Sequence, residues 1–434
     1  MKTHYLILIL YLLLSGCGNS DPNIYWQWSQ PEKTTMGMAE AATNSKGEFL
    51  VCNSYSSSGS TSVDIYSPVF GWKGKYDIGN AIQITLAMND NGQAICVFWE
   101  GNVLKAVQYS PVNGWGKKQI ITTGLNATYI RCVMDPDGRS TIVWSQVGNV
   151  SNFDNLYFSR YEQISGWSSP QKITFTENVY TSLGGIAVSK SSQVLMLWVE
   201  YNASNVLEST FYKSVYTPER GWSLPEAFYN NSGNLRMSKQ MDKDGNVFMI
   251  FGISGNGYAG RIGLTTPFEY KKLKYPSMGF PPITISVNNS GVTFLTWTYF
   301  DGTPNGIPGI CNITYSPESG WSDDDFINQV PKAALPSPFS RGFSGIDDSG
   351  NMFLAYNYME NGSQNIYVIR STSNQFWLPP QKLSNNPVDI FALQLVVSPN
   401  GSALLNWMSI DENAPDHLGN YLSFYRLTNM HFGQ

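Results

Sequence analysis

A turn followed by an aromatic residue recurs along nearly the whole chain, and this repeat limits the possible folds more than any other feature. One copy reads Met134-Asp-Pro-Asp-Gly138 and is followed, six residues after the Gly, by Trp144. In another copy Ser192 replaces the Gly, and Trp198 keeps the same offset. The turns end at positions 47, 92, 138, 192, 245, 291, 350 and 401, about 51 residues apart on average. A constant period of this length indicates a repeat architecture.

A second phrase follows within most units: a Tyr, a short turn that contains Pro, and then Gly-Trp. It is clearest where Tyr109-Ser-Pro111 leads to Gly114-Trp115. Because Pro presets φ for a tight turn and Gly takes a positive φ, the Trp opens a new strand after the turn. Each unit therefore predicts four short strands and no helix. The second strand is apolar on both faces, as from Val194 to Trp198, so each sheet should lie between two others.

Such units predict an all-β fold: an eight-bladed β-propeller of four-stranded antiparallel blades, closed by the N-terminal strand. Seven blades is the alternative, if the degenerate first or fifth unit does not form a blade. Several outer strands carry Trp-x-x-Pro, and Trp28-Ser-Gln-Pro31 repeats this phrase before the first complete unit. The strand near residues 25–35 should therefore complete the blade built by residues 387–430. The repeat resembles the units of bacterial envelope propellers over about 410 residues, a resemblance that implies a fold and no particular activity.

The first residues have the pattern of an export signal. Lys2 precedes an apolar run, from Tyr5 to Leu14, that is too short to span a bilayer. The run ends in Leu14-Ser15-Gly16-Cys17, which resembles the lipobox of bacterial lipoproteins. The resemblance implies cleavage before Cys17, acylation of the Cys17 thiol with lipid such as palmitate, and attachment of the protein to a membrane.

These boundaries give a signal peptide over residues 1–16, a short anchor linker over 17–23 and one propeller domain over 24–434. Gly18 stands where an Asp would favour the inner membrane, so we expect a lipid anchor in the outer membrane of the bacterial cell envelope. Whether the protein faces the periplasm or the cell surface stays open. The linker is short, and the propeller should lie close to the membrane.

Composition excludes several classes of protein. Charged residues and aromatic residues each make up 14% of the chain, a balance that excludes disorder and coiled coil. A net charge of -5 leaves no basic field for nucleic acid. Only His417 and His431 remain after cleavage, so we expect no metal, no cofactor and no His-dependent triad. The remaining cysteines share no metal or redox spacing and sit in apolar strands, so we interpret them as buried free thiols, with a disulfide left open: Cys52, Cys96, Cys132 and Cys311.

The repeat also predicts which face binds a ligand. In a propeller blade with strands a to d, the a–b and c–d turns share one face, and the b–c and d–a connections share the other. The turns are short and uniform here, whereas the b–c segments differ in every unit, so we place the binding surface on that variable face, around the central channel. Loop residues that do not repeat are the candidate ligand-binding residues: Tyr55, Phe153, Asp154, Tyr201, Tyr299, Phe300, Asp301, Tyr358, Glu360 and Asp416.

Three catalytic or metal-binding interpretations are weaker than their structural counterparts. The acidic turns lack the full ligand set of a calcium loop and fit hairpin chemistry. They differ from sialidase Asp-boxes, in which the aromatic follows the Gly by three residues, and no motif supplies an arginine triad. The repeated Trp residues fit core packing better than sugar stacking. A glycosidase needs two carboxylates about 5–10 Å apart, which the sequence does not show, and the loop acids that offer them fit solvated charges better: Glu100, Asp154, Glu200, Asp301, Glu360, Asp411, Glu412 and Asp416.

Two functional hypotheses remain. The first is a monomeric, lipid-anchored module that binds or scaffolds an envelope protein, similar in outline to the propeller lipoprotein of the outer-membrane assembly machine. The alternative is a carbohydrate-binding, lectin-like protein or a glycan-processing surface lipoprotein. We assign no catalytic residue from the sequence.

Overall fold

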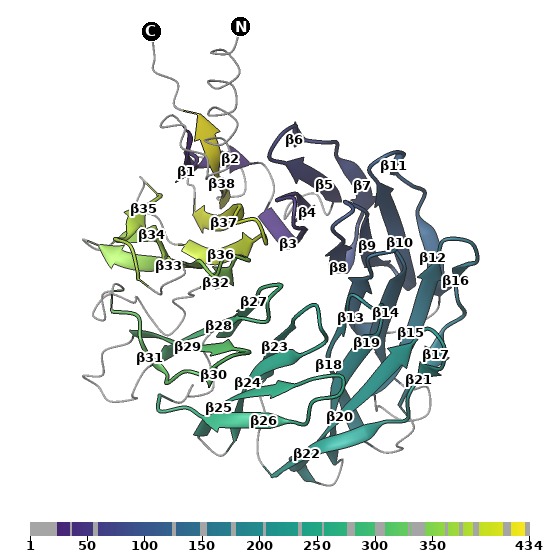
Figure 1. Cartoon of the computed structure of the whole chain (residues 1–434). Helices are drawn as coiled ribbons and strands as arrows, with labels where there is room; N and C mark the ends of the chain where they lie inside the picture. Colours follow the sequence, from purple (N-terminus) through teal and green to yellow (C-terminus); the bar gives the residue numbers. More distant parts are fainter. Residues whose placement is uncertain are drawn as a thin grey trace, which may run out of the picture.

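The computed structural model describes the greater part of the chain, namely residues 24–34, 37–54, 60–123, 127–147, 154–174, 179–202, 205–232, 237–253, 256–275, 283–299, 309–328, 330, 343–360, 363–372, 376–384, 390–410 and 418–429. The predicted signal peptide and Cys17 lie outside the described residues. The strands within these segments fall into eight antiparallel sheets, which we number as blades 1 to 8 (Figure 1). No helix among these residues has the length and apolar character needed to cross a membrane.

Three strands of each blade follow one another in the chain. The innermost strands of blades 1 to 8 are β3 (Gly37–Thr43), β8 (Ile82–Met88), β13 (Ala127–Met134), β18 (Val179–Val188), β23 (Met237–Met241), β27 (Ile283–Val287), β32 (Phe343–Ile346) and β36 (Ile390–Val397). The second strands are β4 (Phe49–Ser54), β9 (Ala94–Glu100), β14 (Ser140–Val147), β19 (Val194–Asn202), β24 (Val247–Ile253), β28 (Thr293–Tyr299), β33 (Met352–Glu360) and β37 (Ala403–Ile410). The third strands are β5 (Thr61–Ser67), β10 (Val103–Ser110), β15 (Asp154–Glu162), β20 (Asn205–Thr217), β25 (Asn256–Ile262), β29 (Gly309–Ser316), β34 (Ser363–Arg370) and β38 (Leu418–Asn429).

The outermost position is filled by short strands, often in two pieces. For blades 1 to 4 the pieces are β6 (Gly71–Trp72), β7 (Tyr76–Gly79), β11 (Gly114–Trp115), β12 (Gln119–Thr123), β16 (Gly166–Trp167), β17 (Gln171–Lys172), β21 (Gly221–Trp222) and β22 (Glu226–Ser232). For blades 5 to 8 they are β26 (Glu269–Lys272), β30 (Gly320–Trp321), β31 (Asp325–Phe326), β35 (Gln381–Lys382), β1 (Ile24–Trp28) and β2 (Glu32–Thr34). The Gly-Trp phrases thus begin outer strands, as the sequence predicts.

The inner strands contact one another in chain order, and β36 contacts β3, so the ring is continuous. The first and fifth units each form a sheet, namely β3 to β7 and β23 to β26. The predicted all-β propeller of four-stranded antiparallel blades is confirmed.

Every a–b turn is closed in the same way. The backbone N–H of its fourth residue donates to the carbonyl of its first residue, at 3.0–3.2 Å in all eight turns. The fourth residue has a positive φ: seven are Gly, and the eighth is Ser192, with φ 61°. Because this position must be left-handed in a bulged hairpin, Gly marks seven of the eight turns in the sequence, and Ser192 is found by its place in the repeat.

The first residue of each a–b turn is Asn, Asp or Ser, and its side chain satisfies the turn. Asp242 accepts from the backbone N–H groups of Asp244 and Asn246, at 2.9 and 2.8 Å. Asn89 makes the equivalent bonds and also donates to the carbonyl of Asp135 in the next blade, at 3.1 Å. The acidic turns are therefore hairpin caps, and no group of three metal-ligating side chains occurs among the described residues.

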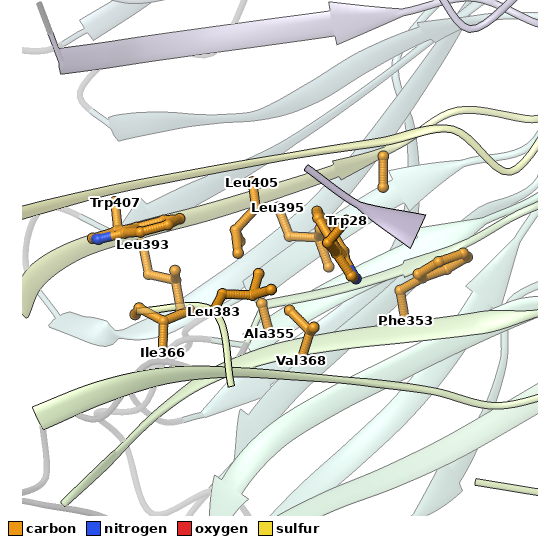
Figure 2. Packing of buried hydrophobic residues seen from close by; sticks show 11 residues of the cluster. Trp28, Phe353, Ala355, Ile366, Val368, Leu383, Leu393, Leu395, Leu405 and Trp407 are labelled. Carbon is orange, nitrogen blue, oxygen red and sulfur yellow. The ribbon is translucent and has the colours of Figure 1, made fainter. Parts of the chain in front are cut away.

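The N-terminal strand closes the ring. β1 pairs antiparallel with β38 from Ile24↔Asn429 to Trp28↔Tyr425, and β2 pairs further along the same strand. The predicted completion of the last blade is confirmed. Figure 2 shows Trp28 in one apolar layer with Leu395 of blade 8 and Val368 of blade 7.

The repeated aromatics pack between blades. Trp144, Trp198, Trp297 and Trp407 are at most 2% exposed, which confirms the core interpretation. The four described cysteines are buried, as predicted, and none of them is in a disulfide. Burial raises the pKa of the Cys52 thiol to about 12, so this thiol stays protonated and unreactive at neutral pH.

Candidate functional site

We call the side of the propeller with the a–b and c–d turns the turn face, and the opposite side the loop face. Of the predicted ligand-binding residues, Asp154 begins β15 and Glu360 ends β33, both at the loop face. Tyr201, Tyr299 and Tyr358 lie near the loop-face ends of the second strands β19, β28 and β33. The other five lie outside the described residues: Tyr55, Phe153, Phe300, Asp301 and Asp416.

The three tyrosines are half-buried. The ring of Tyr299 lies 5.4 Å from that of Tyr275 and 6.0 Å from that of Phe326, centroid to centroid. Tyr358 packs edge-on against Tyr367 at 5.6 Å. Burial raises the pKa of Tyr201 above its ordinary value. These rings brace the strand ends, and their contact with a ligand stays a prediction.

The described loop-face acids also have partners within the blades. Glu100 forms an ion pair with Lys105 across the β9–β10 hairpin. Glu200 is 6% exposed and accepts a hydrogen bond from the indole N–H of Trp198 at 3.1 Å. Both carboxylates therefore make structural contacts within their own blades. Asp411 and Glu412 lie outside the described residues.

The central channel contains two neighbouring hollows. In the described sheets, each inner strand lies at the end of the hydrogen-bonded order, so its second edge lines the channel. A hollow of about 470 Å³ is lined by β3, β27, β32, β36 and Gln240. Another, of about 270 Å³, is lined by β18, Arg131 and the same Gln240, and it reaches between blades 4 and 5 to Leu195, Leu197 and Val247. Strand edges of this kind present backbone N–H and C=O groups to a ligand.

Three neighbouring blades carry a polar row at one level of the channel. Glu40, Thr85 and Arg131 each stand three residues before the end of their inner strands, β3, β8 and β13. The Glu40 carboxylate accepts hydrogen bonds from the Leu86 backbone N–H and the Thr85 hydroxyl. Burial raises the pKa of Glu40 to about 7, against the opposing effect of the Arg131 charge. Glu40 therefore titrates near neutral pH inside the channel.

Three exposed apolar or aromatic residues lie beside the channel on the loop face, in neighbouring blades 2, 3 and 4. Ile82 is 60% exposed, Tyr129 61% and Tyr180 42%, and all three lie near the first residues of β8, β13 and β18. We call these three residues the loop-face rim. Tyr129 has φ 54°, and the β13–β14 register shifts beside it. A bulge of this kind turns a side chain away from the regular strand.

The rim and the polar row lie outside the b–c segments in which the sequence predicts ligand contacts, so neither was predicted. The sequence does contain a sign of the rim, since large apolar or aromatic residues stand near the starts of three inner strands, before the buried positions of the repeat begin. Glu40, Thr85 and Arg131 were also visible as polar residues at one repeat position.

Replacing Glu40 with Gln should make stability less dependent on pH. In the folded protein the pKa of Glu40 is about 7, above its ordinary value of 4.5, so the folded state holds this proton more tightly. Below pH 4.5 the Glu40 carboxyl is protonated in both the folded and the unfolded state, and its contribution to stability is complete. As pH rises from 4.5 toward 7, the unfolded chain releases this proton first, so the folded state loses that contribution. Between pH 5 and pH 8 the natural protein should therefore lose about 2 kcal/mol of unfolding free energy that the Glu40→Gln variant keeps. Urea unfolding across this range measures it, with the exposed Glu226→Gln as the control that should show no gain.

No protein-family model matches the sequence, and no curated protein is significantly similar to it. Solved structures do share its fold. The propeller of Dos1 superposes with a TM-score of 0.51 at 9% identity, over 92% of this chain and 95% of that chain. A polysaccharide lyase, an ulvan lyase of family PL25, reaches 0.48 at 10% identity over 90% and 96%. A variant of the NanB sialidase from Streptococcus pneumoniae reaches 0.41 at 9% identity over 93% and 95%. The similarity to Dos1 supports the β-propeller fold, and at these identities it extends to the fold alone.

Proposed function

We propose that the protein is a lipid-anchored envelope propeller that binds a protein partner through its loop face. One observation carries this proposal: the chain enters the propeller from the turn face. Trp28 pairs with Tyr425, which is level with the a–b turn of its blade, opposite Ala403. Ile24 pairs with Asn429, four residues further along, so β1 begins beyond the turn face.

The direction of entry orients the propeller with respect to an anchor. Six residues separate Cys17 from β1, which span at most about 25 Å when extended. An acylated Cys17 would hold the turn face toward the outer membrane. The loop face, with its segments of unequal length, its rim and the channel opening, would then point toward a partner.

Among the residues that the structure describes, the loop-face acids Glu100 and Glu200 support binding more than hydrolysis. Glycosidase chemistry needs two cooperating carboxylates. Glu100 and Glu200 have partners within their blades, and the charged group that acts on Glu40 is the cation of Arg131. Exposed aromatic and apolar side chains beside a channel are typical of a binding surface.

Pull-down from crosslinked envelopes tests the partner, and rim variants test the face. Tyr129→Asn removes the ring and keeps a residue that tolerates positive φ; together with Ile82→Ser it should lower partner yield about tenfold, since interface aromatics often contribute more than 1.4 kcal/mol. The matched control is Ile120→Ser: Ile120 is 62% exposed on the outer strand β12 of the same blade. Equal losses in both would place the binding surface elsewhere.

A carbohydrate ligand is the second candidate, because Tyr129 and Tyr180 are exposed in the same part of the molecule as the Arg131 cation. Aromatic rings that stack on sugar faces, beside a guanidinium that pairs with a carboxylate, fit an acidic glycan. A glycan array run beside the pull-down separates the candidates. Selective binding of acidic glycans that Tyr129→Asn abolishes, without a reproducible protein partner, would replace the first proposal.

A further inference from the structure

Apolar residues stand at the tips of the c–d turns in the blades around the chain entry. Val69 is 79% exposed, Phe70 78%, Val112 88% and Ile164 fully exposed, in blades 1, 2 and 3. On the other side of blade 8, Phe376 of blade 7 is 70% exposed. We call these five residues the apolar tips. Turn tips are normally polar, and several exposed apolar side chains on the same face of a molecule indicate an interaction surface.

The equivalent turns of other blades differ in chemistry. Val69, Val112 and Ile164 share one turn position, two residues before the Gly of Gly-Trp. Glu219 in blade 4 and Glu318 in blade 6 occupy the same position. The turn geometry therefore accepts a charge, and the repeat does not require an apolar residue there. The apolar choice is confined to the arc of blades that begins beside β1 and β2, along β6, β11 and β16 (Figure 1).

Cations accompany the tips of blades 1 and 2. Lys73 lies 5.9 Å above the Phe70 ring, and Lys75 and Lys117 are exposed on the outer segments that follow the two turns. No Asp or Glu occurs between residues 67 and 76 or between 110 and 119. The corresponding segment of blade 6 carries Asp323, Asp324 and Asp325. Lys73 forms an ion pair with Glu48, and the Lys75 charge acts on the Asp64 carboxylate, so part of the positive charge in blade 1 is balanced within the blade. Exposed apolar tips followed by Lys75 and Lys117 still fit a surface of anionic lipid headgroups, into which such side chains insert by about 5–10 Å.

We infer that the turn face docks on an anionic lipid surface through the apolar tips and the lysines that follow them, on the arc of blades next to the chain entry. This inference rests on the proposed lipid anchor, which would bring the same arc to the membrane. The lipid anchor would limit the distance between the propeller and the membrane, and the apolar tips would set the tilt of the propeller. The loop face would then be held at a defined angle to the bilayer.

Fluorophores on single introduced cysteines test the docking. The full chain is prepared from bacterial membranes as Phe70→Cys or Val112→Cys and reconstituted in vesicles of phosphatidylcholine with phosphatidylglycerol. The four described cysteines are at most 8% exposed and do not take up label. Quenching by a lipid-borne spin label should be about threefold stronger at positions 70 and 112 than at Glu318→Cys, the same turn position in blade 6. Leu224→Cys, an exposed apolar position on the outer wall, should behave like Glu318→Cys.

The outcomes separate docking from anchoring. Vesicles that carry the protein but show no quenching at positions 70 and 112 would overturn the docking and leave the anchor intact. If the protein does not float with vesicles and Cys17 itself takes up label, the anchor is wrong. Docking is then judged by adding vesicles to the labelled chain, where quenching at 70 and 112 supports it and none overturns it. Protection of both probes by envelope proteins, and not by lipid alone, would identify a protein partner and overturn the lipid surface.

Discussion

Replacing Asp135 with Ala should lower the free energy of unfolding by about 3–5 kcal/mol. The Asp135 carboxylate is 1% exposed and accepts hydrogen bonds from the Arg139 backbone N–H and guanidinium, at 2.9 and 2.7 Å. The Arg160 guanidinium, 6% exposed, lies 3.3 Å from it. The variant would leave a buried cation without this counterion and backbone donors without an acceptor. Urea denaturation of the natural protein and the variant measures the difference.

Two matched variants separate the parts of this network. Asp137→Ala removes a carboxylate that is 70% exposed and 2.6 Å from Arg139, so it should cost less than about 1 kcal/mol. Asp135→Asn should recover the bonds to the turn backbone, because Asn89 makes them at the equivalent position in blade 2. Its cost should be about half that of Asp135→Ala. A cost for Asp137→Ala equal to that for Asp135→Ala would show that the exposed turn, and not the buried pair, provides the stability.

The turns of this propeller could be predicted from the sequence because their causes are local. A left-handed fourth residue and an Asx cap both lie within one turn, and positive φ at Gly47 through Gly401 follows from residues a few positions away. The closing strand was also predictable, because Trp28-Ser-Gln-Pro31 repeats an outer-strand phrase found in complete blades. Because the N-terminal segment matches the outer strands of complete blades, its pairing with the last blade could be predicted although the two segments lie at opposite ends of the chain.

The candidate site could be predicted only in part, because its causes are not local. Tyr299 was chosen since it does not repeat, yet its ring is packed by Tyr275 and Phe326. The row of Glu40, Thr85 and Arg131 comes from three blades, and the pKa of Glu40 depends on burial that no single unit reveals. The exposure of Tyr129 follows from a bulge at the start of β13, which the sequence pattern does not mark.

Replacing Trp28 with Ala should cost about 3–5 kcal/mol in the free energy of unfolding, because a large buried aromatic leaves a cavity between blades 7 and 8. Trp28 is 8% exposed and belongs to one cluster with Phe353, Leu405 and Trp407. The same side chain fastens the outer strand β1 to β38 of the last blade (Figure 1), so β38 should also lose protection at its free edge. Urea unfolding measures the cost, and amide hydrogen exchange along residues 418–429 measures the opening of the edge.

The control is Trp72, which stands at the same repeat position in blade 1 but does not join the two ends of the chain. Trp72 begins the outer strand of blade 1, is 40% exposed and packs on Tyr66 at 5.4 Å. The outer strand that contains Trp72 is connected in the chain to the other strands of its own blade. Trp28, in contrast, belongs to a strand that comes from the start of the chain and joins the last blade only by pairing and packing. Trp72→Ala should therefore cost about 1–2 kcal/mol and leave exchange in β38 unchanged. If the two variants cost the same and β38 stays protected in both, the ring is closed by contacts between blades 8 and 1, such as Leu404 with Phe49 and Val51, and the N-terminal strand covers an edge that is stable without it.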